Sequence, residues 1–266
     1  MTKPTKPTTR TNNSAGSGSV DVIWAPSTAI PFEAIELVAA VASEDWEFVL
    51  RNREYLLYGA LITVALTGTS IVLGFLLGFP AGAIELYGGR YSSAFVRKAG
   101  VVIRGTPILV IMVFTFFVFP LDWLFVLPVS EPFQAAILAL GVRSAAYQSQ
   151  IFRGALQSID RGQLEAAESI GLSRWRSIRY VLVPQALRRS VPGFQNEFTI
   201  VLKDTSIAFA IGLGELLRRS HSLMTEQTTA ALELFLFASL IYFTLTVSTN
   251  RTLEFVNDHY AIPGEG

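Results

Sequence analysis

The sequence predicts an all-α, polytopic membrane protein with five transmembrane helices. Of its 266 residues, 51% are hydrophobic and 16% are charged, whereas soluble domains have roughly 45–50% apolar and about 25% charged residues. The mean hydropathy is +0.44. The apolar residues are gathered into separate runs, and most Lys and Arg residues lie in only some of the loops between those runs. This arrangement is typical of a chain that crosses a bilayer several times.

The two ends of the chain differ from its middle. Residues 1–20 are rich in Thr, Ser, Asn, Gly and Pro, so we expect a disordered tail. They lack the apolar core of a cleavable signal peptide, which predicts insertion through the protein's own helices. Residues 21–50, acidic and apolar at helical spacing in their later part, are expected to form an extracytoplasmic or interfacial segment. The transmembrane domain, which includes a loop at 158–185, is expected at 51–255, followed by a C-terminal cytoplasmic tail at 256–266.

Five apolar runs account for the predicted spans. The first, Tyr55 to Ile84, contains no charged residue and exceeds the roughly 20 residues that a helix needs to cross a bilayer. Its small and hydroxyl residues, from Thr63 to Gly74, either permit close helix packing, which we favour, or line a translocation path. The other runs are 105–121, 132–152, 192–213 and 234–250. The second run is expected to begin as a helix at Pro107, with Thr106 as its N-cap.

The distribution of basic residues predicts the orientation, because short cytoplasmic loops carry an excess of Lys and Arg. The loop 122–131 has no basic residue, whereas the loops on either side of it in the chain are rich in them. The basic residues of those two loops are Arg90, Arg97, Lys98 and Arg104, then Arg153, Arg161, Arg174, Arg176, Arg179, Arg188 and Arg189. We therefore expect both loops and the C-terminus in the cytoplasm. Five spans then place the N-terminus outside, although Arg51 and Arg53 weigh against this.

The second basic loop, residues 158–185, is predicted to fold into a helix-turn-helix elbow. Asp160 followed by Gln163 is typical of a helix N-terminus, where the two side chains satisfy free backbone amides. Gly171 has the freedom to adopt the left-handed conformation that ends such a helix. Ser173 would cap a second helix, which Pro184 would interrupt.

The same loop carries acidic, small and aliphatic residues at fixed offsets. These residues are Glu165, Ala166, Ala167, Gly171, Val181, Val183 and Pro184. An amphipathic hairpin that merely lies on the membrane does not require them at these positions. The pattern resembles the coupling-loop signature, the EAA motif, of the permease subunits of ABC importers. Val181 and Val183 replace the commoner Ile and Leu and keep an aliphatic shape.

Other short motifs extend this resemblance over most of the chain after residue 50. They are Arg-Gly-Thr-Pro at 104–107, Ser-Ala-Ala-Tyr at 144–147, Ile-Phe-Arg-Gly at 151–154 and Lys-Asp-Thr-Ser at 203–206. Together they make the chain similar to the polar amino-acid uptake branch of ABC permeases, the family of histidine and glutamine permeases. The N-terminal 50 or so residues fall outside the resemblance.

The resemblance implies the type I permease fold of ABC importers and a place in the plasma membrane of a prokaryotic cell. It implies a dimer with a second copy or a sister permease, a pair of ATPase subunits bound at the EAA residues, and an external solute-binding protein that delivers an amino acid. The chain has no Gly-x-x-x-x-Gly-Lys-Ser/Thr phosphate loop. Magnesium-bound ATP would therefore be hydrolysed by the partner, and we expect no catalytic residue and no cofactor in this chain.

Composition argues against other classes of site and partner. The chain has no cysteine and two histidines, so we expect neither a disulfide nor a metal site. The formal net charge is zero, and nothing points to nucleic acid. A membrane enzyme is disfavoured because no nucleophile constellation is recognisable.

Charged residues within two of the apolar runs need a partner or a wet cavity, because a charge at the bilayer centre costs about 2.5–3.5 kcal/mol on insertion scales. These residues are Arg143, Glu197, Lys203 and Asp204. At about 1.5 Å per residue, Arg143 and Asp204 are expected at one depth. They either form an ion pair that joins two helices or line a translocation path. Lys203 would pair with Asp204 or reach toward lipid headgroups.

On the second reading, the substrate path is lined by Arg143, Tyr147 and Gln150 from one run and by Glu197, Asp204, Thr205 and Ser206 from another. Related permeases commonly have Asn at position 143 and Glu at position 150. Both changes make the path more positive, which favours glutamine or glutamate over cationic amino acids. The alternative is an ion-coupled secondary amino-acid transporter, which also has intramembrane charges but normally has more spans and no docking loop.

Overall fold

The computed structural model describes residues 43–119 and 129–260, all within one compact unit, 41–266. Every regular element in these ranges is helical, which confirms the predicted all-α class. The elements are α2 (Arg53–Tyr87), α3 (Arg90–Gly105), α4 (Ile108–Val118), α6 (Glu131–Gln157), α7 (Arg161–Ser169), α8 (Arg174–Ser177), η1 (Ile178–Leu182), α9 (Val183–Asp204), η2 (Thr205–Ile211), α10 (Leu216–Glu226), η3 (Thr228–Ala230) and α11 (Ala231–Tyr260). The predictions for 1–20, for most of 21–50 and for 261–266 fall outside the described residues.

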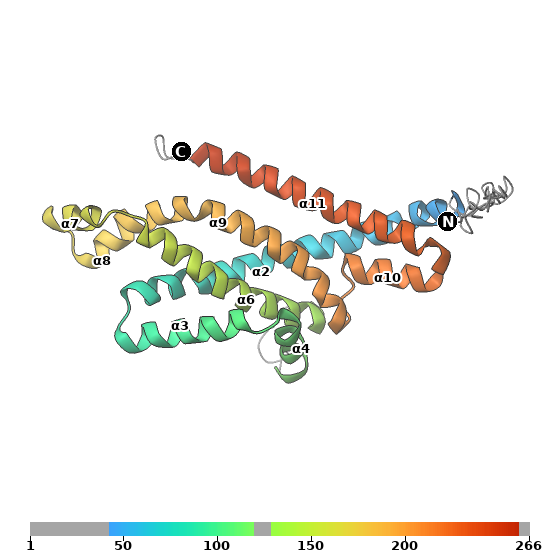
Figure 1. Cartoon of the computed structure of the whole chain (residues 1–266), viewed down its shortest axis with the longest axis horizontal. Coiled ribbons are helices and arrows are strands. Elements are labelled where there is room, and N and C mark those ends of the chain that lie inside the picture. Colours follow the sequence, from blue (N-terminus) through green and yellow to red (C-terminus); the bar gives the residue numbers. More distant parts are fainter. Residues whose placement is uncertain (1–42, 120–128, 261–266) are drawn as a thin grey trace, which may run out of the picture. The chain divides into compact units, whose positions relative to one another are not determined.

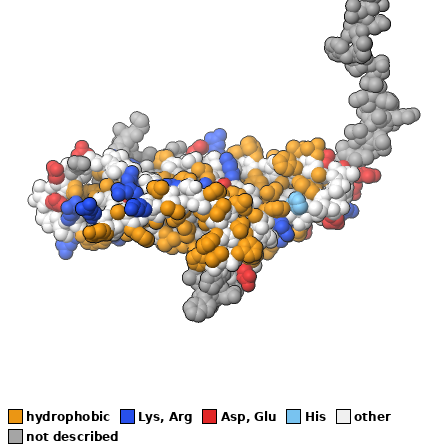
Figure 2. Space-filling view, turned by 60° about the horizontal axis from the view of Figure 1, so that its bottom comes forward, with side chains coloured by type: hydrophobic (Ala, Val, Ile, Leu, Met, Phe, Trp, Pro, Cys, Tyr) orange, Lys and Arg blue, Asp and Glu red, His pale blue; other side chains and the backbone are white. Residues whose placement is uncertain are grey.

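The helices α2, α6 and α9 pack side by side, and most of the other elements contact one of them (Figure 1). Within the unit, α7 and α8 lie at one end of this bundle and α10 lies at the opposite end (Figure 1). We refer to these as the elbow end and the α10 end. On the face shown in Figure 2, apolar side chains cover the middle, and Lys and Arg side chains gather toward the elbow end.

The packing of α2 against α6 depends on residues without bulky side chains. Of the small and hydroxyl residues predicted to pack closely, Thr67, Ser70 and Gly74 are buried, and Gly74 faces Ser144 and Gln148 of α6. Thr63 is buried toward α10, where its hydroxyl accepts from the amide of Leu216, and Thr69 is exposed. The sequence analysis missed Gly78 and Gly82, which follow further along α2 and face the backbone of α6. A Cβ atom on Gly78 would lie 2.7 Å from the carbonyl oxygen of Ala145, so only glycine allows the two backbones to approach this closely.

The second predicted span, 105–121, is not one straight helix. Its apolar part forms α4, which has 11 residues and is too short to cross a bilayer alone. The preceding basic segment, expected as a loop, forms the amphipathic helix α3, and the two helices meet at an angle of 103°. Thr106 does not cap α4, because its hydroxyl donates to the carbonyl of Val102 and closes α3 instead. The N-cap position of α4 is Pro107, so this helix begins one residue later than predicted.

Length and apolar composition identify two helices in the described ranges that are able to span a membrane, α2 and residues 228–255, or three spans if the bent pair α3–α4 counts as one. The predicted spans 132–152 and 192–213 correspond to α6 and to α9 with η2, where charged residues lower the hydropathy. The bundle thus has the form of a helical membrane protein. Helix α11 runs on to Tyr260, into the region assigned to the C-terminal tail.

The part of the predicted interfacial segment that the structure describes packs into the bundle. Residues 43–51 are helical, and Val49 is fully buried in a cluster with Leu216 of α10 and Leu234 of α11. Asp45 is also buried and accepts hydrogen bonds from Gln227 Nε2 at 2.7 Å and from the Thr229 hydroxyl at 2.8 Å. This short helix therefore holds the turn between α10 and α11.

Candidate functional site

The first helix of the elbow, α7, begins after Asp160 and ends before Gly171 as the sequence predicts, with the Asp160 side chain alone of the predicted Asp160–Gln163 pair forming the cap. The Asp160 carboxylate accepts a hydrogen bond from the amide of Gly162 at 2.6 Å, which caps α7. At the other end of α7, Gly171 has φ +89°, the left-handed conformation that glycine adopts most easily. The amide of Leu172 donates back to the carbonyl of Ala167 at 3.2 Å and closes the helix.

The second helix of the elbow differs from the prediction. Ser173 occupies the N-cap position of α8, but its side chain makes no capping hydrogen bond. Pro184 does not interrupt the helix, because it lies in the first turn of α9, where proline is tolerated. The π-helical turn η1 joins α8 to α9. One continuous helical path therefore runs from Arg174 in the elbow to Asp204.

The elbow presents a mixed apolar and basic surface. Of the EAA residues, Ala167 is buried against the bundle, while Glu165, Ala166 and Gly171 are exposed. The large apolar side chains exposed on the elbow are Ile170, Trp175 and Tyr180, with 80%, 73% and 68% of their surfaces accessible. Arg174, Arg176 and Arg179 are exposed beside them. Exposed apolar side chains gathered with charges are typical of a protein interaction surface.

At the far end of α9, Arg143 and Asp204 form an ion pair with 2.6 Å between Nη1 and Oδ2. The equal depth expected for these two residues is therefore confirmed. The Arg143 guanidinium also lies over the Tyr147 ring, 4.9 Å from its centroid. The Arg143 and Asp204 side chains retain 16% and 22% of their exposure, so the pair borders open space rather than a sealed core.

The other predicted path residues do not all join this pair. Gln150 donates to the Glu85 carboxylate of α2 at 2.9 Å, nearer the elbow end, and Arg153 approaches the same carboxylate at 3.7 Å. Glu197 and Thr205 are buried, and the Thr205 hydroxyl donates to the carbonyl of Leu202. The structure brings together Arg143, Tyr147 and Asp204, with Glu197 close enough to interact electrostatically with both members of the pair and with Ser206 two residues further along, on η2.

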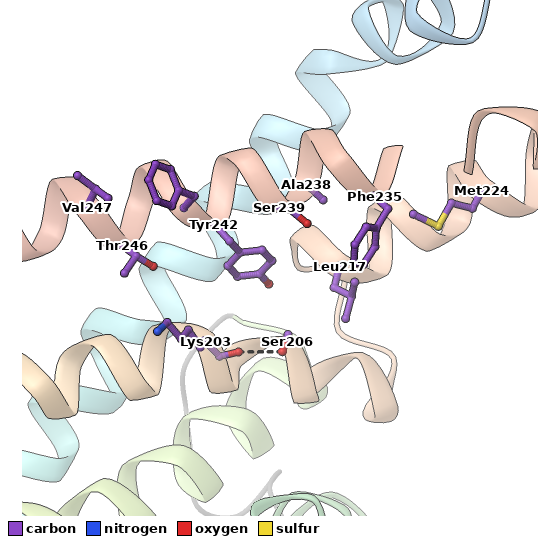
Figure 3. A pocket seen from close by; sticks show the side chains of 11 residues that line it. Lys203, Ser206, Leu217, Met224, Phe235, Ala238, Ser239, Tyr242, Thr246 and Val247 are labelled. Carbon is purple, nitrogen blue, oxygen red and sulfur yellow. Dashed lines mark hydrogen bonds between the residues drawn. The ribbon is translucent and has the colours of Figure 1, made fainter. Parts of the chain in front are cut away.

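A pocket of about 620 Å³ lies between α9 with η2 on one side and α10 with α11 on the other (Figure 3). Its polar residues are Lys203, Ser206, Ser239, Tyr242 and Thr246. Its apolar residues are Leu217, Met224, Phe235, Ala238, Phe243 and Val247. Figure 3 shows the Tyr242 ring projecting from α11 toward the side that holds Lys203 and Ser206. Among the described residues, no carboxylate forms an ion pair with Lys203.

This pocket was missed by the sequence analysis. Lys203 was considered only as a partner of Asp204 or as a residue that reaches the headgroups. A signal was nevertheless present, because Ser239, Tyr242 and Thr246 recur at three- and four-residue steps and share one face of an apolar helix. The described residues contain no group of three His, Asp or Glu side chains suited to a metal ion.

Comparison with known proteins places the chain among transport proteins. Residues 70–261 match the family described as the binding-protein-dependent transport system inner membrane component. The chain is 34% identical over 203 residues to the glutamine transport system permease protein GlnP of Escherichia coli K12, covering 76% of this chain and 91% of that protein. The probable glutamine permease GlnP of Bacillus subtilis is 36% identical over 201 residues, covering 74% and 90%.

Among solved structures, the chain is similar to one described as an amino acid ABC transporter with histidines. The TM-score is 0.69 at 27% sequence identity, and the match covers 79% of this chain and 96% of that one.

Proposed function

The chain belongs to the family of binding-protein-dependent transport system inner membrane components and is an ABC importer permease for amino acids; we propose that its preferred cargo is glutamine or glutamate. The observation that supports the role of a coupled permease is the helical path along α9. One helical path links the elbow to the Arg143–Asp204 pair and to the Lys203 pocket. The glutamine permeases that it resembles, at 34% and 36% identity, support the choice of cargo.

We infer the partners from the elbow surface and from the family. A pair of ATPase subunits would dock on the elbow, with Glu165, Ala166, Ala167 and Gly171 at the contact, and would bind magnesium and ATP. The exposed Ile170, Trp175 and Tyr180 side chains supply the apolar area that such a contact needs. The permease would pair with a second copy or a sister permease and receive its cargo from an external solute-binding protein.

This assignment gives an orientation in the prokaryotic plasma membrane. The elbow end and the C-terminus would face the cytoplasm, and the α10 end and the N-terminus would face outside. The basic side chains gathered at the elbow end support it, because cytoplasmic segments carry the excess of Lys and Arg (Figure 2). The solute-binding protein would then dock at the α10 end, next to the pocket.

The chemistry of the pocket suits an amino acid with a polar or acidic side chain. The Lys203 ammonium would bind a carboxylate, and the hydroxyls of Ser206, Ser239 and Tyr242 would hydrogen-bond to the rest of the polar groups. Arg143, on α6, is paired with Asp204, so among the described residues Lys203 is the cation near the path without an ion-pair partner. The Lys203 charge repels arginine and lysine, whereas glutamine and glutamate place only an amide or a carboxylate there.

Transport would follow from movement of α9. Closure of the ATPase dimer would draw the two elbows of the permease dimer together, and the path from α8 to α9 would carry this displacement to Lys203 and Asp204. The Arg143–Asp204 pair would break or re-form as α9 shifts against α6. Access to the pocket would thereby alternate between the two sides of the membrane.

The cargo is tested by uptake of labelled glutamine into proteoliposomes that contain the complete transporter with its own binding protein. Excess glutamine or glutamate should suppress the signal, and arginine, lysine or histidine should not. Lys203→Met should lower uptake about tenfold, since it removes a charge-assisted hydrogen bond. Lys203→Arg, which keeps the charge, should retain more activity. Competition by cationic amino acids alone, or full uptake in Lys203→Met, would contradict the proposed cargo site.

A further inference from the structure

Glu215 makes an unusual set of hydrogen bonds for a carboxylate without surface exposure. Its Oε1 atom accepts from the amide of Arg218 at 2.7 Å, and its Oε2 atom accepts from the amide of Leu217 at 2.8 Å. Both amides belong to the first turn of α10, so the side chain caps this helix. The same Oε2 atom also accepts from the Tyr242 hydroxyl at 2.9 Å. One buried carboxylate therefore joins the start of α10 to a residue of the pocket.

Helix α10 is itself a wall of the pocket. Leu217 lies in its first turn and Met224 in its last, and both line the pocket opposite Lys203 and Ser206 (Figure 3). Glu215 thus binds both the first turn of this pocket wall and the Tyr242 hydroxyl, which also interacts with the hydroxyls of Thr63 and Thr205. Burial raises the pKa of the Glu215 carboxyl, and the two amides and the Tyr242 hydroxyl act in the opposite direction.

The start of α10 is fixed to the rest of the bundle by further contacts. Arg219 lies over the rings of Tyr55 and Tyr58 on α2, 4.2 Å and 4.7 Å from their centroids, and its Nε atom donates to the carbonyl of Gly214 at 2.9 Å. The far end of α10 is held separately, through the hydrogen bonds from Gln227 and Thr229 to Asp45. Three sets of contacts, at Glu215, Arg219 and Asp45, thus hold α10, and of these only Glu215 bonds directly to residues that line the pocket, Leu217 and Tyr242.

We propose that Glu215 is a positioning residue for amino-acid binding: by holding Tyr242 and the first turn of α10 in one arrangement, it sets the affinity of the pocket. A partner that displaces α10 from the outside would change that affinity through the same bonds. This inference rests on the proposed function of the pocket. It assigns the role to Glu215 and Tyr242, which make the contact, and gives none to the Asp45 anchor.

The test measures amino-acid binding to the purified permease–ATPase complex without its binding protein, by equilibrium dialysis. The probe is whichever of the twenty common amino acids the wild type binds most tightly. Tyr242→Phe and Glu215→Gln should each weaken binding about tenfold, because each removes a hydrogen bond to a charged group. The double variant should lose less affinity than the product of the two single losses, since the two residues share one contact. Asp45→Asn, the matched control, should bind like the wild type.

Thermal unfolding of the same complexes separates positioning from general damage. Tyr242→Phe should keep a melting temperature close to that of Asp45→Asn while it loses affinity. Wild-type affinity in both Tyr242→Phe and Glu215→Gln would overturn the inference and leave the pocket as the binding site. Additive losses in the double variant, or an equal loss in Asp45→Asn, would also overturn it. Absence of binding of any amino acid by the wild type would instead overturn the proposed function of the pocket, and the inference with it.

Discussion

Glu165→Lys should nearly abolish ATP-driven uptake while the protein still folds and inserts. Glu165 is exposed on α7 within the EAA spacing, where we propose that the ATPase docks. Reversal of its charge would place a cation where the proposed contact takes a carboxylate. Loss of a buried charged pair at a protein interface costs about 2–5 kcal/mol, so uptake should fall about 30-fold or more. The measurement is glutamine uptake in proteoliposomes, together with the amount of ATPase that copurifies.

The control lies on the same short helix. Glu168 is also exposed on α7, three residues from Glu165 and outside the EAA spacing. Glu168→Lys makes the same change of net charge in the same helix, so a nonspecific electrostatic effect would appear in both variants. We expect Glu168→Lys to retain most of its uptake and its bound ATPase. Equal losses in the two variants, or normal uptake in Glu165→Lys, would count against docking at the EAA residues.

Arg143→Gln should cause the second large effect, a loss of both stability and uptake. The change leaves the Asp204 carboxylate without its partner at 2.6 Å, within a bundle whose exterior is lipid. Removal of one member of a buried ion pair costs about 3–5 kcal/mol. A smaller value applies here, because both side chains keep some exposure. Thermal unfolding of the purified protein and uptake in proteoliposomes give the two readouts.

The double variant Arg143→Gln, Asp204→Asn decides between the two roles of this pair. It removes both charges and keeps groups that hydrogen-bond, so the melting temperature should return toward that of the wild type. Uptake should remain low, because the path has lost the cation that we assign to it. If uptake returned together with the melting temperature, the pair would be a fastener between α6 and α9 and would have no place in the path.

Local chemistry predicted the elbow well. Asp160 and Gly171 act through bonds within a few residues of themselves, so the sequence contains all that determines their conformation. The prediction for Pro184 was wrong, because the rule that proline interrupts a helix takes no account of the π-helical turn before it. That turn makes α8 continuous with α9. The continuous helix from the elbow to Asp204 is therefore a feature of the structure that the sequence pattern did not predict.

Features that depend on long-range packing were beyond the sequence analysis. The helix α3 was expected as a loop because its basic residues hide an amphipathic helix, and Arg104 donates to the carbonyl of Ala146 in the middle of α6. The pocket needs Lys203 on α9 to face Tyr242 on α11, and no spacing within either run reveals that approach. The Arg143–Asp204 pair was foreseen only because a depth argument happened to apply.

The central claim, that ATP hydrolysis by a partner drives amino-acid uptake through this chain, is tested most directly in proteoliposomes. The permease, its ATPase and its binding protein are reconstituted, and labelled glutamine is followed with ATP enclosed beside the ATPase. We predict uptake that requires both hydrolysable ATP and the binding protein and that persists when ionophores collapse the proton and sodium gradients. Uptake without ATP that ionophores abolish would contradict the account and identify an ion-coupled transporter.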